Sequence, residues 1–303
     1  MRNFFASVLA CLCLGAVGPT SAACSPAEGV ALQVLGSGGP IADDGRASTG
    51  YIVWVDGKSR VLIDAGSGTF LRFGEARARF IDLEFIGLSH FHTDHSADFA
   101  ALIKSGNFSA RKRPLRVAGP EGAPPFPGLE GFLAALFDRK TGAYAYLSSF
   151  LDGTNGTPML TRREVGRGEP VVVFKGDDLL VEALRVPHGI VPAAAFRVKA
   201  GNTTIVFASD QNGGDPAFAE FAAAASILVM HMVVPEEIRG VGRRLHAPPS
   251  VIGDIAAAAQ PGTLVLSHLM ARSLRNLDAN IALVQERYDG NVVLAEDLLC
   301  VAP

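Results

Sequence analysis

The sequence predicts an α/β fold in which two mixed β-sheets pack face to face and helices cover their outer surfaces. In the first half of the chain, short apolar runs with strand character alternate with glycine turns, and helical stretches follow them. The second half repeats this order of strands and then helices. No sequence repeat accompanies the pattern, and no low-complexity linker divides it. Strand groups followed by helices, twice in succession, favour two sheets that share one core with helices outside.

The first half is expected to begin as a meander. Asp56-Gly57 is a strong hairpin signal between two strands. Residues 97–104 are predicted to be helical, and a loop rich in Pro and Gly over residues 121–129 precedes an amphipathic helix over residues 131–140. The loop and helix open an insertion of about residues 121–165. The predicted strands of this half are residues 30–35, 50–55, 60–63, 83–89 and 115–118.

The second half is predicted to contain six further apolar strands and one clear helix. Pro248-Pro249 starts a helix that reaches residue 259, since proline is favoured in a first helical turn. Asn202 lies in a turn between two strands. The predicted strands of this half are residues 171–175, 179–186, 194–199, 203–209, 227–233 and 263–266.

The N-terminus resembles a secretory signal. Arg2 supplies a positive start, residues 4–17 an apolar stretch, and Ser21-Ala22-Ala23 a cleavage site of small residues. A membrane anchor is the alternative, but about 14 apolar residues fall short of the roughly 20 that span a bilayer. We expect cleavage after residue 23, a mature chain of residues 24–303, and a periplasmic or secreted location without a stable membrane partner.

Charge and cysteine content limit the partners. The mature chain has one basic residue fewer than the 27 of the full sequence, against 30 acidic residues, so its net charge is −4. This balance is not that of a nucleic-acid-binding protein. Cleavage leaves Cys24 and Cys300, which in an oxidising compartment either form one disulfide or stay free thiols. Lipidation of Cys24 is disfavoured because residues 21–23 lack a large aliphatic residue.

Three of the seven histidines lie in the segment His90-Phe91-His92-Thr93-Asp94-His95. In an extended loop His90 and His92 point to the same side and can share one ion. Asp94 and His95 face elsewhere, and a helix starting here would direct them to a second ion. Imidazole and carboxylate ligands suit Zn²⁺, and also Mn²⁺ or Fe. The alternative is a surface loop with fortuitous metal affinity, which would not explain the remaining pattern.

Three further candidate ligands each follow an apolar strand: His188, Asp210 and His268. Any one of them alone is more often a structural residue. Together with the histidine segment they complete seven ligands, which is enough for two ions.

This arrangement resembles the metallo-β-lactamase superfamily over nearly all of the mature chain. The resemblance implies a four-layer αββα sandwich and a binuclear metal-dependent hydrolase. It implies that His90, His92 and His188 hold one ion, that Asp94, His95 and His268 hold the other, and that Asp210 bridges them. A hydroxide between the ions would be the nucleophile. We take Asp94 and His246 as the catalytic residues.

Within the superfamily the chain resembles the tRNase Z branch and the exported zinc-dependent arylsulfatases. Residues 34–40 resemble their glycine-rich first loop, and residues 62–66 their second signature. By this resemblance Asp64 orients a histidine ligand; capping of a strand-to-loop turn is the alternative. His246 occupies the place of a histidine that touches the substrate phosphate and protonates the leaving group. His231, in an apolar strand, is interpreted as a core histidine.

Two departures from the tRNase Z pattern bear on the substrate. Where that branch has His-Glu, this chain has His231-Met232, so Glu236 or Glu237 would have to orient His246. Residues 121–160 hold few basic residues and no tRNA-clamping arm. Since export also separates the chain from tRNA precursors, we expect a small anionic ester and no nucleic-acid partner.

The leading hypothesis is therefore an exported phosphodiester or aryl sulfate ester hydrolase. A lactonase or β-lactamase and a non-catalytic periplasmic metal-binding protein are the alternatives, and monomer and homodimer stay open. Aromatic residues of the insertion either accept an aromatic leaving group or cap the core. They are Phe126, Phe132, Phe137, Tyr144, Tyr146 and Phe150.

Overall fold

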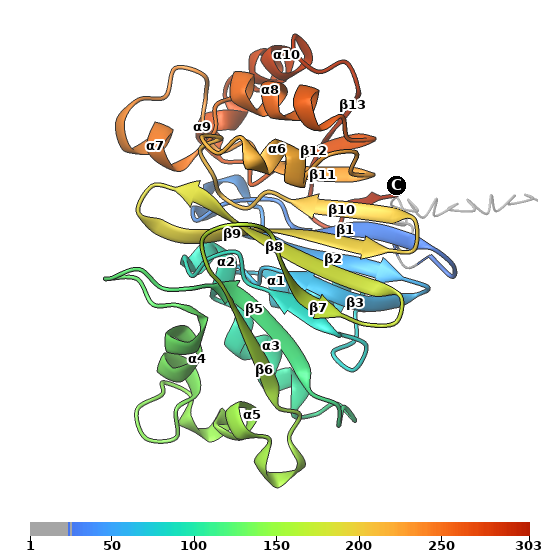
Figure 1. Ribbon diagram of the computed structural model, residues 1–303, viewed down its shortest axis with the longest axis vertical. Coiled ribbons are helices and arrows are strands. Elements are labelled where there is room, and N and C mark those ends of the chain that lie inside the picture. The colour runs from blue at the N-terminus through green and yellow to red at the C-terminus, as the bar shows by residue number, and fades with distance from the viewer. Residues whose placement is uncertain (1–23, 25) are drawn as a thin grey trace, which may run out of the picture.

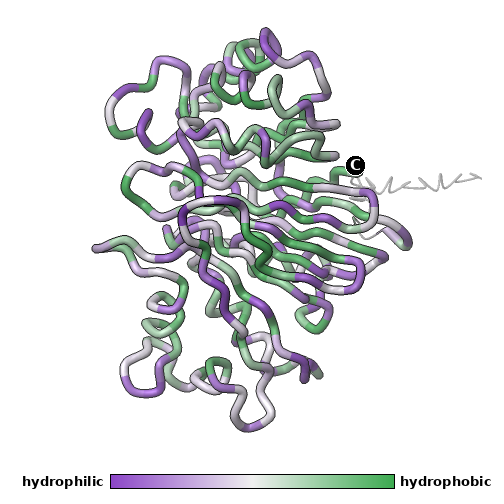
Figure 2. Tube along the Cα trace, in the orientation of Figure 1, coloured by the Kyte–Doolittle hydropathy of each residue, from purple (hydrophilic) through white to green (hydrophobic). Residues whose placement is uncertain are grey.

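The computed structural model describes residue 24 and residues 26–303. The predicted signal, residues 1–23, lies outside the described residues. Two seven-stranded mixed sheets face each other and helices cover both outer surfaces (Figure 1), so the predicted four-layer α/β sandwich is confirmed. Figure 2 shows green stretches along many of the strands and purple mostly in the loops and turns between elements.

The first sheet has the strand order β14-β1-β2-β3-β4-β5-β6. It is antiparallel from β14 to β3 and parallel from β3 to β6. Its strands are β1 (Val30–Gly36), β2 (Gly50–Val55), β3 (Lys58–Ile63), β4 (Phe85–Gly87), β5 (Leu115–Pro120), β6 (Leu160–Val165) and β14 (Cys300–Val301).

The second sheet has the order β13-β12-β11-β10-β9-β8-β7. It is antiparallel from β7 to β10 and parallel from β10 to β13. Its strands are β7 (Val171–Lys175), β8 (Leu179–His188), β9 (Val191–Ala200), β10 (Thr203–Phe207), β11 (Ile227–His231), β12 (Thr263–Ser267) and β13 (Asn291–Leu294).

The helices bury apolar residues against the outer faces of the sheets. Phe73 of α1, Phe99 of α3 and Leu133 of α4 pack in one outer cluster, and Phe218 of α6 and Ile252 of α8 in the other. A third cluster fills the space between the sheets. The helices are α1 (Thr69–Glu75), α2 (Thr93–Ser96), α3 (Phe99–Gly106), α4 (Leu129–Phe137), α5 (Ser149–Asp152), α6 (Ala217–Phe221), α7 (Gly240–Leu245), α8 (Pro249–Ala259), α9 (Ala271–Leu274) and α10 (Leu277–Gln285).

Several elements were not predicted. In the first sheet β6 and β14 are new, in the second β13, and among the helices α1, α5, α6, α7, α9 and α10. The segment of residues 121–165 contains α4, α5 and β6, together with short 3₁₀ turns. Cys24 and Cys300 form a disulfide beside the pairing of β14 with β1, which settles the choice between a disulfide and free thiols. Among the described residues, no helix has the length and apolarity to cross a membrane.

Candidate metal centre

The candidate ligands meet where strands of both sheets end. The segment from His90 to His95 follows β4, and α2 begins within it. His92 has an extended backbone, with φ −65° and ψ 151°, directly before the helix. His188 is the last residue of β8, while Asp210 and His268 follow β10 and β12. The strand ends therefore bring residues as far apart in sequence as His90 and His268 into one cluster.

One group of neighbouring ligand atoms comes from His90, His92 and His188, the residues that the resemblance assigned to one ion. The Nε2 of His90 lies 3.0 Å from the Nδ1 of His92. The Nδ1 of His188 donates to the carbonyl of Leu245 at 2.9 Å. That bond fixes the ring and leaves Nε2 buried without a hydrogen-bond partner in the described chain. An imidazole held in this way presents a lone pair to an ion.

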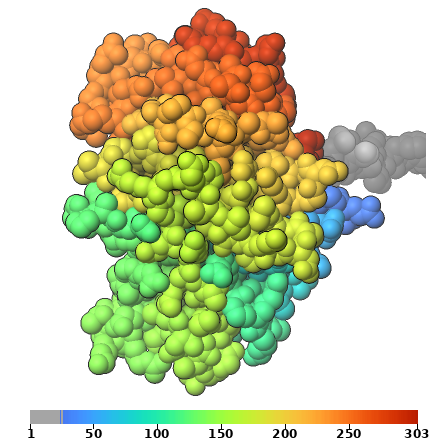
Figure 3. All heavy atoms as spheres, in the orientation of Figure 1, coloured from blue at the N-terminus to red at the C-terminus, as the bar shows by residue number. Residues whose placement is uncertain are grey.

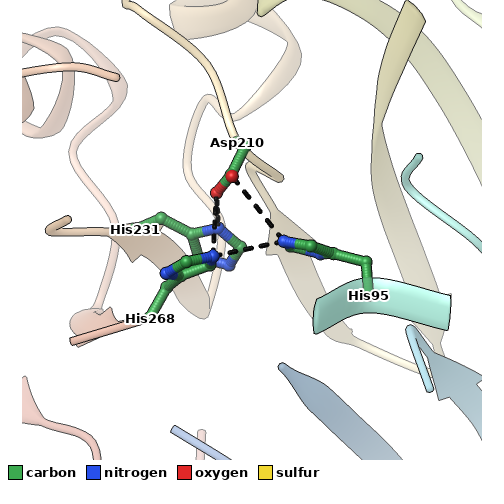
Figure 4. A group of neighbouring side chains, drawn as sticks. All are labelled: His95, Asp210, His231 and His268. Carbon is green, nitrogen blue, oxygen red and sulfur yellow. Dashed lines mark hydrogen bonds and ion pairs between the residues drawn. The ribbon is translucent and has the colours of Figure 1, made fainter. Parts of the chain in front are cut away.

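A second group contains Asp94, His95 and His268. The Nε2 of His268 lies 3.2 Å from the Nε2 of His95 and 3.2 Å from Oδ2 of Asp94. The carboxylate of Asp210 faces both groups: its oxygens lie 3.6 Å from His95, 3.5 Å from His268 and 3.8 Å from His188. Figure 4 shows Asp210 pointing between His95 on one side and His268 on the other.

These spacings fit a metal site. Ligands that bind one ion tetrahedrally at about 2.0–2.1 Å lie about 3.3 Å from each other. The separations of 3.0, 3.2 and 3.6 Å among these buried atoms scatter around that value. The donor set of imidazole nitrogens and carboxylate oxygens is the one that zinc and similar divalent ions prefer. The buried cluster is therefore suited to hold divalent metal.

Asp64 holds one of these histidines in place. Its Oδ2 accepts hydrogen bonds from the Nδ1 of His95 at 2.8 Å and from the hydroxyl of Ser89 at 2.7 Å. Its Oδ1 accepts from the backbone N–H of Ser89 at 2.6 Å. The carboxylate is buried, and its contact turns the Nε2 of His95 toward Asp210 and His268. The contact is consistent with the orienting role that the resemblance implied for Asp64, and that role stays a prediction.

His231 was interpreted as a core histidine, but it contacts the cluster. Its Nδ1 donates to Oδ1 of Asp210 at 2.7 Å, and its Nε2 lies 3.1 Å from the hydroxyl of Tyr51. That hydroxyl donates in turn to Ser267 at 2.9 Å. A signal existed in the sequence, because His231 ends β11 as His188 ends β8. The predicted strand of residues 227–233 placed it in mid-strand instead.

Two glycines of the sequence signatures leave room for the cluster. A Cβ on Gly39 would lie 2.7 Å from Cε1 of His268, and one on Gly66 would lie 2.1 Å from the carbonyl oxygen of Asp94. Neither distance is compatible with a side chain. The first loop thus approaches His268, and the segment of residues 62–66 approaches the segment from His90 to His95, with bare backbone.

A cavity of about 500 Å³ opens onto the cluster. Asp94, His188, Asp210 and His268 form its floor, and Arg272 adds a cation to its wall. The aromatic side chains of the insertion do not line it; Phe91 does, stacked on Phe132 with ring centroids 4.5 Å apart. Phe137 and Phe150 are fully buried, which favours the core alternative for them.

His246 lies in the cavity wall with its Nδ1 3.8 Å from Oδ2 of Asp210. This nitrogen is buried and has no hydrogen-bond partner among the described residues. Glu236 does not orient it, since its carboxylate accepts from the hydroxyl and the N–H of Ser250 at 2.6 and 3.0 Å. The contact with Ser250 instead anchors the first turn of α8, which begins shortly after His246 in the chain.

Burial lowers the pKa of most histidines of the cluster in the metal-free chain. It lowers the pKa of His246 to about 3, against the opposing charge of Asp210. Burial likewise lowers the pKa of His90, His92 and His188. These imidazoles are therefore neutral at pH 7, the form that binds metal. For His95, the charges of Asp64 and Asp210 outweigh burial and raise the pKa.

Comparison with known proteins gives the same assignment of fold. Residues 59–269 match a family model described as a beta-lactamase superfamily domain. The chain is 27% identical over 281 residues to a protein named Ribonuclease Z from Mycobacterium marinum, covering 89% of this chain and 97% of the relative. It is 24% identical over 294 residues to a Ribonuclease Z from Methanosarcina mazei, covering 88% and 95%.

Two solved structures share the fold over most of their length. The metallo-β-lactamase-fold protein YhfI from Bacillus subtilis superposes with a TM-score of 0.66 at 21% identity, covering 90% of this chain and 98% of its own. The short form of human tRNase Z superposes with a TM-score of 0.69 at 18% identity, with the same coverage.

These relatives contradict one expectation. We predicted a small anionic ester as substrate and no nucleic-acid partner, yet curated relatives that align along nearly 90% of the chain are ribonucleases. The prediction was wrong because net charge does not report how charge is distributed. Residues 121–160 have only two basic side chains, but Arg162, Arg163 and Arg167 follow directly, on and after the unpredicted strand β6.

Proposed function

Because the chain belongs to the metallo-β-lactamase superfamily, we propose that it is a metal-dependent phosphodiesterase that hydrolyses RNA. Its class, a hydrolase with the metallo-β-lactamase fold, follows from that membership. The choice of RNA is supported by the Ribonuclease Z relatives. The observation that carries the proposal is Asp210, whose carboxylate faces both groups of ligands at the floor of a cavity.

We assign the two groups of side chains to two metal sites. His90, His92 and His188 would hold one ion, Asp94, His95 and His268 the other, and Asp210 would contact both. Bound divalent ions, for which we propose Zn²⁺ with Mn²⁺ or Fe as alternatives, would act as Lewis acids and lower the pKa of a coordinated water. The protein keeps the ligand atoms in place through Asp64 on His95, His231 on Asp210 and the Leu245 carbonyl on His188.

Three side chains in the cavity are placed to act on a phosphodiester. Arg272 is half-buried in the wall, with its Nε donating to the carbonyl of Val233 at 2.9 Å, so its remaining donors can face a phosphate. Asp94 is placed to accept a hydrogen bond from the attacking water. We propose that the negative charge of a bound phosphodiester raises the pKa of His246, whose Nδ1 has no partner in the described chain, and that the protonated ring then donates its proton to the leaving oxygen.

Hydrolysis of two substrates tests the proposal. Protein loaded with Zn²⁺ or Mn²⁺ should cleave both bis-p-nitrophenyl phosphate and a single-stranded RNA. His92→Ala should abolish both activities, whereas Asp98→Asn, a change near the segment but outside the cluster, should not. Fully metallated protein that cleaves neither substrate would refute the proposal. p-Nitrophenyl sulfate, a lactone and a β-lactam are assayed in parallel. If the protein hydrolyses only one of these three, that compound class replaces phosphodiesters as the proposed substrate.

The role of His246 has its own test. His246→Ala should slow RNA, which has a poor leaving group, far more than bis-p-nitrophenyl phosphate, whose leaving group needs no proton. Equal losses on both substrates would exclude proton donation.

We further propose that the enzyme acts outside the cytoplasm. Residues 1–23 have the pattern of a secretory signal, and the Cys24–Cys300 disulfide is of a kind that persists in oxidising compartments. Fractionation of cells that express the full chain, followed by mass measurement of the recovered protein, tests this. A protein that stays in the cytoplasm with residues 1–23 attached would contradict it.

A further inference from the structure

A second cavity, of about 340 Å³, adjoins the metal cluster, and His188 lines both. The loop after β6 forms one wall of it, and the end of β8 with the turn to β9 forms another. The yellow hairpin turn, the yellow-green loop and the green start of the insertion come together at the surface in Figure 3. None of the residues assigned to the reaction, apart from His188, lies in this cavity.

Two arginines line the second cavity. Arg185, on β8, is half-buried: its Nε donates to the carbonyl of Ala193 at 3.1 Å, and its Nη1 to the carbonyls of Glu121 and Val165 at 3.2 and 3.3 Å. Its Nη2 makes no hydrogen bond within the described residues. Arg167, in the loop, is exposed and has neither a hydrogen bond nor an ion pair to any described residue.

The two guanidinium groups repel each other. Burial and the charge of Arg167 lower the pKa of Arg185, and Glu121 only partly offsets them. Asp215 also lines the cavity, but its Oδ1 accepts the N–H of Ala217 at 3.0 Å, at the start of α6. An anion between the arginines would relieve the repulsion and use donors that no carboxylate of the described residues occupies.

Part of the wall is apolar. Ile190, at the tip of the two-residue turn between β8 and β9, is 78% exposed, a high value for so large an apolar side chain. Val191 and Pro192 continue the surface. An apolar face beside two cations matches a nucleotide, with its planar base and charged phosphate.

We propose that this second cavity binds the phosphate and nucleoside that adjoin the scissile phosphodiester on an RNA strand. Arg167 and Arg185 contact that neighbouring phosphate, and Ile190 packs against the nucleoside. The guanidinium fork suits a phosphate because it offers two parallel donors. The inference rests on the proposed function, since it adds a binding site to the same reaction.

Two substrates separate this site from the chemistry. Bis-p-nitrophenyl phosphate has one phosphate and fills only the metal site, whereas a fluorescein-labelled 12-nucleotide RNA has neighbouring phosphates. Arg167→Ala is the test variant, because this exposed side chain makes no hydrogen bond or ion pair to any residue that the structure describes. Arg77→Ala is the matched control, because Arg77 is also exposed and has no side-chain partner among the described residues. Arg77 lies before β4, whereas the segment from His90 to His95 follows β4, so the two lie at opposite ends of that strand.

Arg167→Ala should raise KM for the RNA about tenfold, leave its kcat within about twofold and leave bis-p-nitrophenyl phosphate unaffected. By fluorescence anisotropy, the slope of log Kd for the RNA against log salt should become shallower by about 0.7, the value for one lost phosphate contact to a single strand. Arg77→Ala should change neither quantity.

The failures are distinguishable. If the wild-type protein turned over neither substrate, the proposed function would be refuted. RNA binding that depends on Arg167 would still support the second cavity as a binding site in that case. Turnover of RNA with an unchanged KM and an unchanged salt slope in Arg167→Ala would refute the cavity alone. An equal loss on both substrates would also refute it, because it would place Arg167 in the chemistry or in the stability of the fold.

Discussion

Replacing Asp64 by Asn should weaken metal binding at His95. The substitution keeps the shape of the side chain but turns one acceptor oxygen into a donor. If the amide nitrogen faces His95, it meets the N–H at Nδ1, where Oδ2 now accepts at 2.8 Å. If it faces the other way, it meets the backbone N–H of Ser89 that Oδ1 accepts at 2.6 Å. Either orientation sets two donors against each other in a buried site.

The size of the effect follows from these contacts. A hydrogen bond to a charged group contributes about 1.5–3 kcal/mol. Since about 1.4 kcal/mol corresponds to a tenfold change in a binding constant, the ion next to His95 should bind about 10- to 100-fold more weakly. Loss of contacts of this kind behind a metal ligand has effects in the same range. The variant also loses stability, because Ser89 is buried and loses part of its hydrogen bonding.

Competition with a chromophoric zinc chelator measures the affinity, and circular dichroism checks that Asp64→Asn is folded. Asp98→Asn is the matched control. Asp98 accepts the backbone N–H of Phe70 at 2.9 Å and is near in sequence to the metal segment, but it touches no histidine. Wild-type affinity in Asp64→Asn, or an equal loss in Asp98→Asn, would refute the orienting role.

Three further outcomes are expected. The pKa of His246 is about 3 in the folded chain against 6.5 unfolded, so between these values the unfolded state binds one proton more and stability falls on acidification, by about 1.4 kcal/mol per pH unit. Urea unfolding of metal-free protein should show this fall, with a shallower pH slope in His246→Gln; higher stability in acid would contradict it. Cys300→Ser should cost about 2–5 kcal/mol and lower Tm, and an unchanged Tm would show that the disulfide does not stabilise the fold. Gly39→Ala should displace the ring of His268, which its Cβ would approach to 2.7 Å, and weaken zinc binding, whereas Gly74→Ala, which meets nothing within 4 Å, should bind normally.

The parts of the fold that could be predicted from the sequence are those in which burial requires a recognisable pattern of apolar residues. Strands such as β2 and β11 are continuous apolar runs because they are buried on both faces. β6 has Arg162-Arg163-Glu164 at its centre, without apolar alternation. Its strand conformation comes from pairing with β5, a contact that local sequence does not report.

The candidate site likewise contains residues that local sequence marks and residues that only the packing of the fold brings together. The segment from His90 to His95 is a local motif, and His188 and His268 could be added because polar residues at strand ends stand out. Arg167 and Arg185 are single arginines in unremarkable contexts. Only the packing of the end of β6 against β8, where Arg185 donates to the carbonyl of Val165, brings them to one cavity.

β6 is also the last strand of its sheet, hydrogen-bonded to β5 on one side only. A strand in this position offers a row of unpaired N–H and C=O groups to any other strand, including the same strand of a second copy. If two copies of β6 paired, the successive charged residues Arg162, Arg163 and Glu164 would place like charges opposite each other in many registers. The same charges keep this edge of the sheet solvated. The charged residues that kept β6 from being predicted as a strand thus disfavour edge-to-edge aggregation of the folded protein.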